Sequence, residues 1–145
     1  MKVRIKWLGQ MGFEAETGSG HIVAIDGPPE HGGQNSAARP MEMVLVGLGG
    51  CSAFDVVKIL KKARQPIKKC EVVLEAERAD AIPAVFTRIH LHYIISGLDL
   101  NAKQVKRAVE LSVEKYCSVA VMLRDNVEIS YDHEVQEAGN IKPNS

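Results

Sequence analysis

Three short segments at the start of the chain alternate apolar and polar side chains, which is the pattern of β-strands with one buried face. These segments are Val3 to Leu8, Phe13 to Thr17 and His21 to Ile25. The sequence Gly18-Ser19-Gly20 favours a turn between the last two, so we expect a three-stranded meander. The prolines and glycines from Gly27 to about Ala38 continue neither periodicity and predict a loop.

The most apolar part of the chain lies in a predicted helix from Pro40 to Arg64. Proline suits a first helical turn and Glu42 suits the positive helix end, whereas Gln65-Pro66 marks the stop. The first half of this helix is apolar on every side, so it must be enclosed by a sheet, another helix or a second subunit. The apolar run from Met41 to Phe54 is shorter than the ~20 residues that a bilayer requires, which predicts a core helix rather than a membrane span.

The rest of the chain predicts a hairpin, two helices and a closing strand. Asn101 and Gln104 resemble a helix-capping pair, and Ser118 is the expected cap of the shorter helix. The expected elements are strands at Cys70 to Arg78 and Val85 to Ile95, a helix from Asn101 to about Tyr116, a short helix from Ser118 through Leu123, and a strand around Val127 to Tyr131.

The resulting order, β-β-β-α-β-β-α-α-β, predicts an α+β fold with its helices gathered on one side of a largely antiparallel sheet. The length favours a single domain over residues 1–137, followed by a short polar tail over residues 138–145.

Charge and the start of the chain limit the partners and the compartment. Lysine plus arginine and aspartate plus glutamate both total 18, so no net field attracts nucleic acid or an anionic membrane. The segment from Met1 to Trp7 alternates and lacks the apolar run of a signal peptide, so we expect a cytoplasmic protein with reduced thiols.

Gly47-Leu48-Gly49-Gly50 also matches the Gly-x-x-Gly loop of KH-type RNA-binding domains, but it lies in the most apolar segment of a neutral chain.

The three cysteines are an odd number, which does not suit a structural disulfide framework. In a reducing compartment a cysteine pair points to redox chemistry or to metal binding. No Cys-x-x-Cys or His-x-x-x-His occurs, so we expect no metal site. His90 and His92 share one face of a strand, but two ligands do not make a site, and a polar sheet face is the expected alternative.

Cys51 is the first candidate for chemistry, because three glycines precede it closely within the apolar helix. Gly47, Gly49 and Gly50 each cost ~1 kcal/mol relative to alanine in a helix. Such glycines permit the close approach of a substrate to the thiol, or the close packing of another backbone. The sequence does not decide between these two interpretations.

A mid-helix cysteine needs a nearby cation or hydrogen-bond donor to become a thiolate. Arg39 is the candidate, since it is the only arginine between Arg4 and Arg64 and lies beside the start of the helix. Glu42 is placed to orient its guanidinium through a bidentate pair. The alternatives are a solvated Arg39 and a Glu42 that serves only as a helix-start charge.

Cys117 is the second candidate, because it lies between two predicted helices, just ahead of Ser118. Amide dipoles at the start of the third helix would help to stabilise a thiolate there. A mobile junction also suits a resolving cysteine, which traps a sulfenic acid as a disulfide before further oxidation. The alternative is a buried small hydrophobe. Cys70, at a strand start, is expected to be structural.

Two segments carry a family resemblance, since both cysteine motifs occur in the right order. Pro40-Met41-Glu42-Met43-Val44-Leu45-Val46-Gly47-Leu48-Gly49-Gly50-Cys51-Ser52 resembles the Pro-x-Glu-Leu, small-small-Cys helix of the OsmC/Ohr superfamily, the osmotically inducible and organic hydroperoxide resistance proteins. Glu114-Lys115-Tyr116-Cys117-Ser118-Val119 resembles the second cysteine motif of its small OsmC-like branch.

The resemblance implies an intertwined homodimer with antiparallel sheets around long central helices and two active sites at the subunit interface. It also implies a reaction in which the Cys51 thiolate attacks a hydroperoxide, Cys117 resolves the sulfenic acid, and an external thiol reduces the disulfide. No metal or organic cofactor is implied. The family's arginine on the N-terminal hairpin is absent here, and its catalytic acid falls one position before Glu42, so Arg39, His21 and Glu42 are our substitutes for them.

The leading hypothesis is therefore a cysteine-based peroxidase that reduces organic hydroperoxides in oxidative stress defence. The alternative is a non-catalytic module that binds a small apolar or electrophilic ligand in the same groove.

Overall fold

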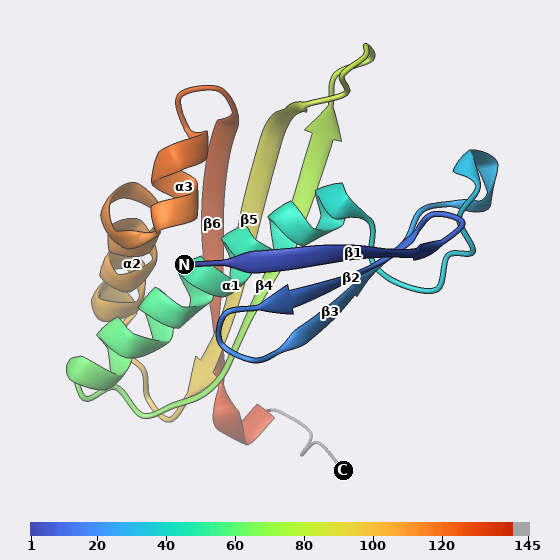
Figure 1. Ribbon diagram of the computed structural model, residues 1–145. Coiled ribbons are helices and arrows are strands. Elements are labelled where there is room, and N and C mark those ends of the chain that lie inside the picture. Colours follow the sequence, from blue (N-terminus) through green and yellow to red (C-terminus); the bar gives the residue numbers. More distant parts are fainter. Residues whose placement is uncertain (141–145) are drawn as a thin grey trace. The chain divides into compact units, whose positions relative to one another are not determined.

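The computed structural model describes residues 1–140. These residues form two compact units, Met1–Val46 and the chain from Gly47 onward, and the boundary falls within helix α1 (Pro40–Lys62). Of the predicted polar tail, Ala138–Asn140 forms the short 3-10 turn η3, and residues 141–145 lie outside the described residues. Figure 1 shows the elements of both units along the chain.

The N-terminal unit contains the predicted meander of three antiparallel strands. These are β1 (Val3–Gly9), β2 (Gly12–Thr17) and β3 (Ile22–Ile25). Gly20 has a positive φ of 89°, which glycine adopts without steric cost in the turn between β2 and β3. The loop that follows contains one 3-10 turn, η1 (Pro29–His31).

Asp26 organises this loop from the end of β3. Its buried carboxylate accepts hydrogen bonds from the amides of Gly27, Gln34 and Ser36, at 2.7, 3.2 and 3.1 Å, and from the Ser36 hydroxyl at 2.6 Å. The Ser36 hydroxyl bond is the largest cause that lowers the pKa of Asp26 to about 2, followed by the amide bonds. The ionised carboxylate therefore fixes both ends of the loop.

The second unit has a three-stranded sheet with helices on one face (Figure 1). The observed order of elements confirms the predicted α+β arrangement. The elements are β4 (Ile67–Arg78), β5 (Phe86–Gly97), α2 (Ala102–Leu111), the π-helical turn η2 (Ser112–Tyr116), α3 (Ser118–Leu123) and β6 (Glu128–Glu137).

The antiparallel prediction is correct for β1–β2, β2–β3 and β4–β5, but β5 and β6 are parallel. The reason is the connection between them, which consists of two helices and a π-helical turn. Such a crossover returns the chain to the end of the sheet where β5 begins, so β6 must run in the same direction as β5. The alternation of side chains along β6 alone does not predict whether this strand runs parallel or antiparallel to β5.

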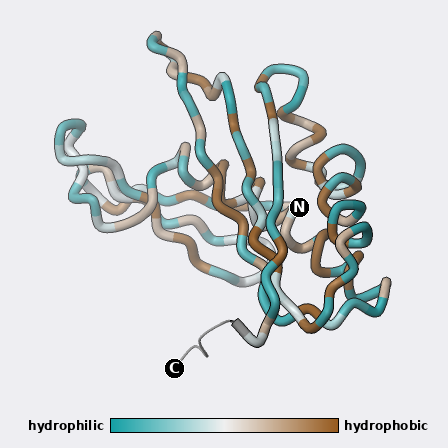
Figure 2. The backbone as a smooth tube through the Cα atoms, turned by 180° about the vertical axis from the view of Figure 1, so that it is seen from behind, coloured by the Kyte–Doolittle hydropathy of each residue, from teal (hydrophilic) through white to brown (hydrophobic). Residues whose placement is uncertain are grey.

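The central strand β5 supplies much of the core. Its inward residues Ile89, Leu91, Tyr93 and Ile95 are fully buried. In Figure 2, hydrophobic colour runs along strands of this sheet, whereas the connecting turns are mostly hydrophilic. Helix α2 covers the sheet with a buried stripe at helical spacing, formed by Val105, Ala108 and Val109. As predicted, the side chain of Asn101 caps this helix, accepting from the amides of Lys103 and Gln104.

The part of helix α1 that belongs to the second unit, from Gly47 onward, is covered by that unit on one side. Gly49 packs against β4 so closely that a Cβ atom would lie 2.7 Å from Leu74 Cδ1. Gly47 and Gly50 have no heavy atom within 4 Å of such a position, and Phe54 is 71% exposed. The packing interpretation therefore holds for Gly49, while the second unit by itself does not enclose the helix on every side.

The composition of α1 also meets the length and hydropathy criterion for a membrane span, contrary to our estimate of its apolar length. Its mean hydropathy over the most apolar window is 1.8. The core helix of a soluble protein meets the same criterion. Leu48, Val56 and Leu60 are fully buried, but only 28% of this window is buried, so the core helix that we expected is only partly covered.

We predict that Asp26→Asn loosens the loop without unfolding the sheet of the second unit. Hydrogen exchange at the Gln34 and Ser36 amides should become several-fold faster, because the ionised acceptor is lost. The contribution of Asp26 is present above its unfolded pKa of 3.8 and is lost as the pH falls through about 2. Glu30→Gln, an exposed change in the same loop, is the control. Equal exchange rates in both variants would contradict the assignment.

Candidate functional site

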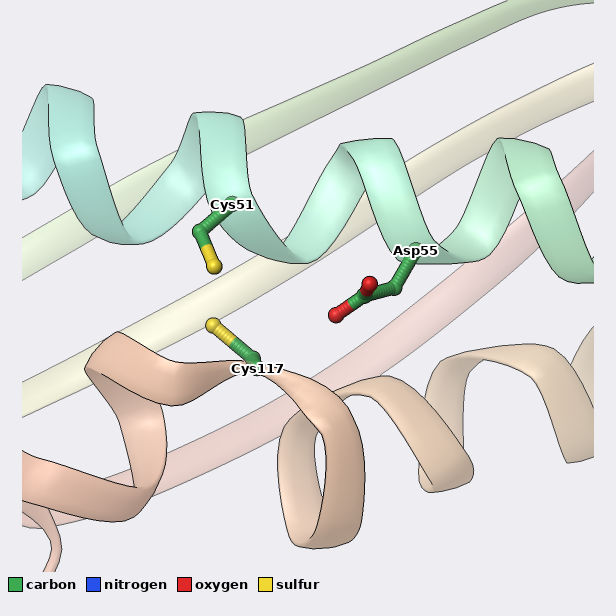
Figure 3. Close-up of side chains that lie close together, drawn as sticks. All are labelled: Cys51, Asp55 and Cys117. Carbon is green, nitrogen blue, oxygen red and sulfur yellow. The ribbon is translucent and has the colours of Figure 1, made fainter.

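The structure brings Cys51 and Cys117 together, although they lie far apart in the sequence. Figure 3 shows their sulfur atoms facing each other, with the Asp55 carboxylate beside them. One ligand atom from each of these three residues lies within 4.8 Å of the other two. Cys51 and Asp55 are one turn apart on α1, and Cys117 lies between η2 and α3.

The position of Cys117 results from an irregularity at the end of α2. The chain widens there into a π-helical turn, in which the amide of Cys117 donates to the carbonyl of Ser112 at 2.7 Å. Cys117 then adopts an extended conformation and becomes the N-cap of α3, where its Sγ accepts from the amide of Ala120 at 3.5 Å. The prediction that Ser118 is the cap is thus wrong by one residue.

Burial dominates the chemistry of Cys117. Its side chain is fully buried, and this burial is the main reason that its pKa is raised to about 11. The Ala120 amide lowers the pKa, but burial and the neighbouring Cys51 outweigh this effect. Contrary to the expected thiolate at the helix start, Cys117 is a thiol at neutral pH, and it donates to the Leu48 carbonyl at 3.9 Å. Cys51, by contrast, is only half-buried.

Cys70 lies outside this group of three. It is half-buried on β4, opposite Ile95 of β5, and burial raises the pKa of its thiol, with a further contribution from Glu71. Its place beside the core agrees with the expected structural role.

Asp55 is the member of the group that sequence reasoning missed. Burial raises its pKa, while the Ser112 hydroxyl and the charge of Lys58 act in the opposite direction. Its Oδ2 atom is buried and has no hydrogen-bond partner among residues 1–140. The available signal was the i, i+4 spacing from Cys51, because a carboxylate one turn away on the same helix projects from the same face as the thiol.

A network of three hydroxyl groups lies beside these residues in the core. The Ser112 hydroxyl donates to the backbone carbonyl of Ser52 at 2.9 Å, and the two serine hydroxyls lie 2.8 Å apart. The Ser52 hydroxyl also bonds to the Tyr93 hydroxyl, whose pKa burial raises to about 12. The Ser112 hydroxyl thus lies between Ser52, to whose carbonyl it donates, and Asp55, whose pKa it lowers.

The same three side chains form the candidate set of metal ligands. Two thiolates and a carboxylate suit Zn²⁺, which requires a fourth ligand in a structural site. No fourth His, Cys, Asp or Glu joins the group within the described part of the chain. Spacing along the sequence argued against a metal site, but tertiary structure rather than spacing unites these donors.

His90 and His92 have a polar setting on the sheet. Both bond to Asp132 Oδ1 on the neighbouring strand β6, at 3.0 and 2.6 Å, and His90 also bonds to Ser130. The bond to Asp132 raises the pKa of His92 and lowers that of Asp132. These contacts agree with the predicted polar sheet face.

The proposed activating residues Arg39, Glu42 and His21 all belong to the N-terminal unit. Glu42 Oε1 accepts from the backbone amide of Arg39 at 2.9 Å, which caps the start of α1. Within residues 1–140, the Arg39 guanidinium forms no ion pair with Glu42, so the bidentate pair that we expected is replaced by this cap. His21 bonds to Ser19 in an exposed turn. Their part in the chemistry stays a prediction.

A cavity of about 630 Å³ lies between α1 and α2, and Asp55 forms part of its wall. Its apolar lining consists of Ile59, Ala63, Leu111 and the ring of Tyr116. Lys58, Lys62 and Arg107 add positive charge to the same lining. The cavity thus offers a mainly apolar space next to Asp55, and neither cysteine of the pair is among its lining residues.

The fold defines a class of α+β protein in which two cysteines far apart in the sequence meet beside a long apolar helix. The chain belongs to the OsmC-like family, because the family model described as OsmC-like protein matches residues 33–132. This result confirms the resemblance seen in the sequence.

Individual relatives support the same assignment. Protein YhfA of Escherichia coli K12 is 49% identical over 138 residues, which cover 95% of this chain and 100% of that protein. A hypothetical protein from Aquifex aeolicus VF5 has 31% identity and a TM-score of 0.77, over 94% of this chain and 97% of that one. An organic hydroperoxide resistance protein OsmC from Legionella pneumophila shares the fold, with 20% identity and a TM-score of 0.70 over 93% and 98% of the two chains.

We predict that a mild oxidant joins Cys51 to Cys117 and leaves Cys70 reduced, because only the first two sulfurs are neighbours. Peptide mapping after alkylation should find this single intramolecular disulfide. Cys70→Ser should form it equally well, whereas Cys117→Ser should accumulate oxidised Cys51 instead. A disulfide that includes Cys70 would contradict the geometry.

Proposed function

We propose that this protein is a thiol peroxidase that reduces organic hydroperoxides through Cys51 and Cys117. The observation that carries the proposal is the contact of a half-buried thiol with a fully buried one. The half-buried Cys51 would react with the oxidant first, and the buried Cys117 would react only in the following step. The family includes organic hydroperoxide resistance proteins, which supports the substrate class.

The reaction divides into three steps. The Cys51 thiolate attacks the outer oxygen of the hydroperoxide, the O–O bond breaks, and the alkoxide takes a proton to leave as an alcohol. Cys51 is now a sulfenic acid. The Cys117 sulfur then attacks the Cys51 sulfur, and a disulfide and one water form. Two equivalents of an external thiol reduce the disulfide and restore both cysteines.

The geometry of the sulfurs suits this cycle. Their separation, within 4.8 Å, exceeds the ~2.05 Å of a disulfide bond, so a small movement must accompany the second step. Cys117 lies at the junction of a π-helical turn and a short helix, where few backbone bonds have to change. In the first step, a cation such as Arg39 or His21 would favour the Cys51 thiolate, with Glu42 orienting it, and these roles belong to the proposal.

The cavity beside Asp55 supports an organic rather than an inorganic oxidant. An alkyl tail would bury apolar surface against Ile59 and Leu111 and gain ~25 cal/mol for each Å² removed from water. Hydrogen peroxide has no such tail. The enzyme should therefore discriminate between these oxidants mainly through binding.

The same cavity favours the second candidate function, a non-catalytic module for a small apolar ligand. The two functions differ in their dependence on Cys51. Ligand binding would survive the loss of this thiol, while reduction of a hydroperoxide would not.

We also propose a homodimer in a reducing cytoplasm. The outer side of α1 presents Phe54 together with the uncovered positions of Gly47 and Gly50, which allow close approach of another backbone. A second copy would complete the enclosure of this apolar helix. A reducing compartment would supply the thiols that regenerate the enzyme.

We predict that the purified protein consumes tert-butyl hydroperoxide or cumene hydroperoxide in the presence of a dithiol, faster than it consumes hydrogen peroxide. Cys51→Ser should abolish turnover, and Cys117→Ser should lower it because the sulfenic acid is not resolved. The measurement is peroxide consumption with time. Cys70→Ser is the matched control and should keep full activity. Turnover that survives Cys51→Ser, or a protein that binds hydroperoxide without consuming it, would refute the peroxidase.

We predict that Phe54→Asp shifts the protein from dimer to monomer, because it places a charge in the proposed interface. Light scattering after size-exclusion chromatography gives the mass of each species. Ile82→Asp changes an equally apolar and fully exposed residue in the β4–β5 connection and should leave the dimer intact. A wild-type protein that is monomeric at micromolar concentration would rule out the homodimer.

A further inference from the structure

Asp55 presents an unusual combination of burial and missing partners. Its Oδ2 atom is buried, yet no donor within the described residues reaches it. A buried acceptor without a donor costs free energy, so native structures contain few of them. The burial of the unpaired Oδ2 atom of Asp55 therefore destabilises the fold, and packing alone does not explain why this residue is present.

The surroundings of Asp55 supply no competing role. The Ser112 hydroxyl donates to the Ser52 carbonyl and also lowers the pKa of Asp55, yet Oδ2 keeps no partner within residues 1–140. Lys58 lies near enough to lower the pKa of Asp55 but forms no ion pair with it in residues 1–140. The groups that remain in reach are the two thiols, and Figure 3 shows the carboxylate directed toward the space beside them.

We propose that Asp55 is the base that accepts the Cys117 proton when Cys117 attacks Cys51. This inference rests on the proposed redox function of the two cysteines. A thiol must lose its proton to become a nucleophile, and Cys117 is shielded from solvent bases by its complete burial. A carboxylate within 4.8 Å of the sulfur provides the acceptor, directly after a small rotation or through one water.

The step balances in atoms and charge. As the Cys117 sulfur bonds to the Cys51 sulfur, its proton passes to the Asp55 carboxylate. The S–O bond of the Cys51 sulfenic acid breaks, and its oxygen leaves with a proton from Asp55 as water. Asp55 returns to its ionised form, so one carboxylate acts first as a base and then as an acid.

The Leu48 carbonyl accepts from the Cys117 thiol at 3.9 Å but is not a base, and the other groups near the site in the described part of the second unit do not take this part either. Lys58 on α1 carries a positive charge and has no lone pair to offer. Tyr93 on β5 keeps its proton, because its pKa is about 12, and the Cys70 thiol on β4 also has a raised pKa. Ser112 on η2 is a neutral hydroxyl.

The experiment isolates this proton transfer from hydroperoxide chemistry. Cys51 is converted to its mixed disulfide with thionitrobenzoate in the Cys70→Ser background. Cys117 then attacks Cys51 and releases the thionitrobenzoate anion, whose absorbance gives the rate. The leaving group departs without a proton, so the proton of Cys117 must be taken up by a base.

Asp55→Asn should slow this release by ~100-fold near neutral pH, the usual scale of a general base. The rate should recover as the pH rises and hydroxide replaces the missing base. Asp55→Glu should restore part of the rate, because it retains the carboxylate. Ser112→Ala changes the neighbouring hydroxyl network without removing the base and should stay within a few-fold of the parent.

A rate for Asp55→Asn within two-fold of the parent would overturn the proposal. If the variant does not fold, the pH dependence of the parent protein tests the proposal. With a carboxylate base, the rate of thionitrobenzoate release should level off around neutral pH. Without one, the rate should rise tenfold per pH unit throughout. A steady tenfold rise would exclude a carboxylate base. Because no hydroperoxide is used, a protein that passes this test but fails the peroxidase assay refutes only the peroxidase.

Discussion

The burial of the Cys117 sulfur beside Cys51 is the constraint on which the rest of the site depends. Burial raises the pKa of Cys117 to about 11, so this sulfur stays protonated while the half-buried Cys51 meets the solvent. The two thiols differ in environment rather than in chemical nature, and this difference defines their proposed order of reaction. The π-helical turn before Cys117 maintains this difference in environment, because the widened turn directs the Cys117 sulfur inward and lets it cap α3.

The polar groups around this sulfur fall into two sets. The hydroxyls of Ser52, Tyr93 and Ser112 satisfy one another in a closed network that joins α1, β5 and η2. Asp55 remains outside this network with an unpaired oxygen. Within residues 1–140 two buried side-chain oxygens depart from the ordinary rule for buried polar groups, Asp55 Oδ2 and Ser96 Oγ, and the Asp55 oxygen is the one that lies in the group with the two thiols. Such local violations are characteristic of functional positions, where stability is exchanged for reactivity.

Local sequence rules predicted the parts of the structure that local interactions determine. The Pro40 start of α1 and the Asn101 cap of α2 were correct because each depends on bonds within a few residues. The cap of α3 was missed by one position, since sulfur rarely replaces an oxygen there. The parallel pairing of β5 with β6 and the place of Asp55 beside Cys117 depend on contacts between distant segments, which periodicity does not encode. The resemblance to a family implied the cysteine pairing, but the motifs that carry it end before Asp55 and did not point to this residue.

Helix α1 links these observations, because its successive residues point in directions about 100° apart. Gly49 and Val56 face the sheet, Cys51 and Asp55 face Cys117, and Phe54 lies on the uncovered side. A rigid helix transmits any displacement of one side to the others. A partner that covers Phe54 would therefore press α1 onto its own sheet and fix the separation of the two sulfurs. In this view the proposed dimer is part of the redox site, since it would hold Cys51 and Asp55 at the distance from Cys117 that the chemistry requires.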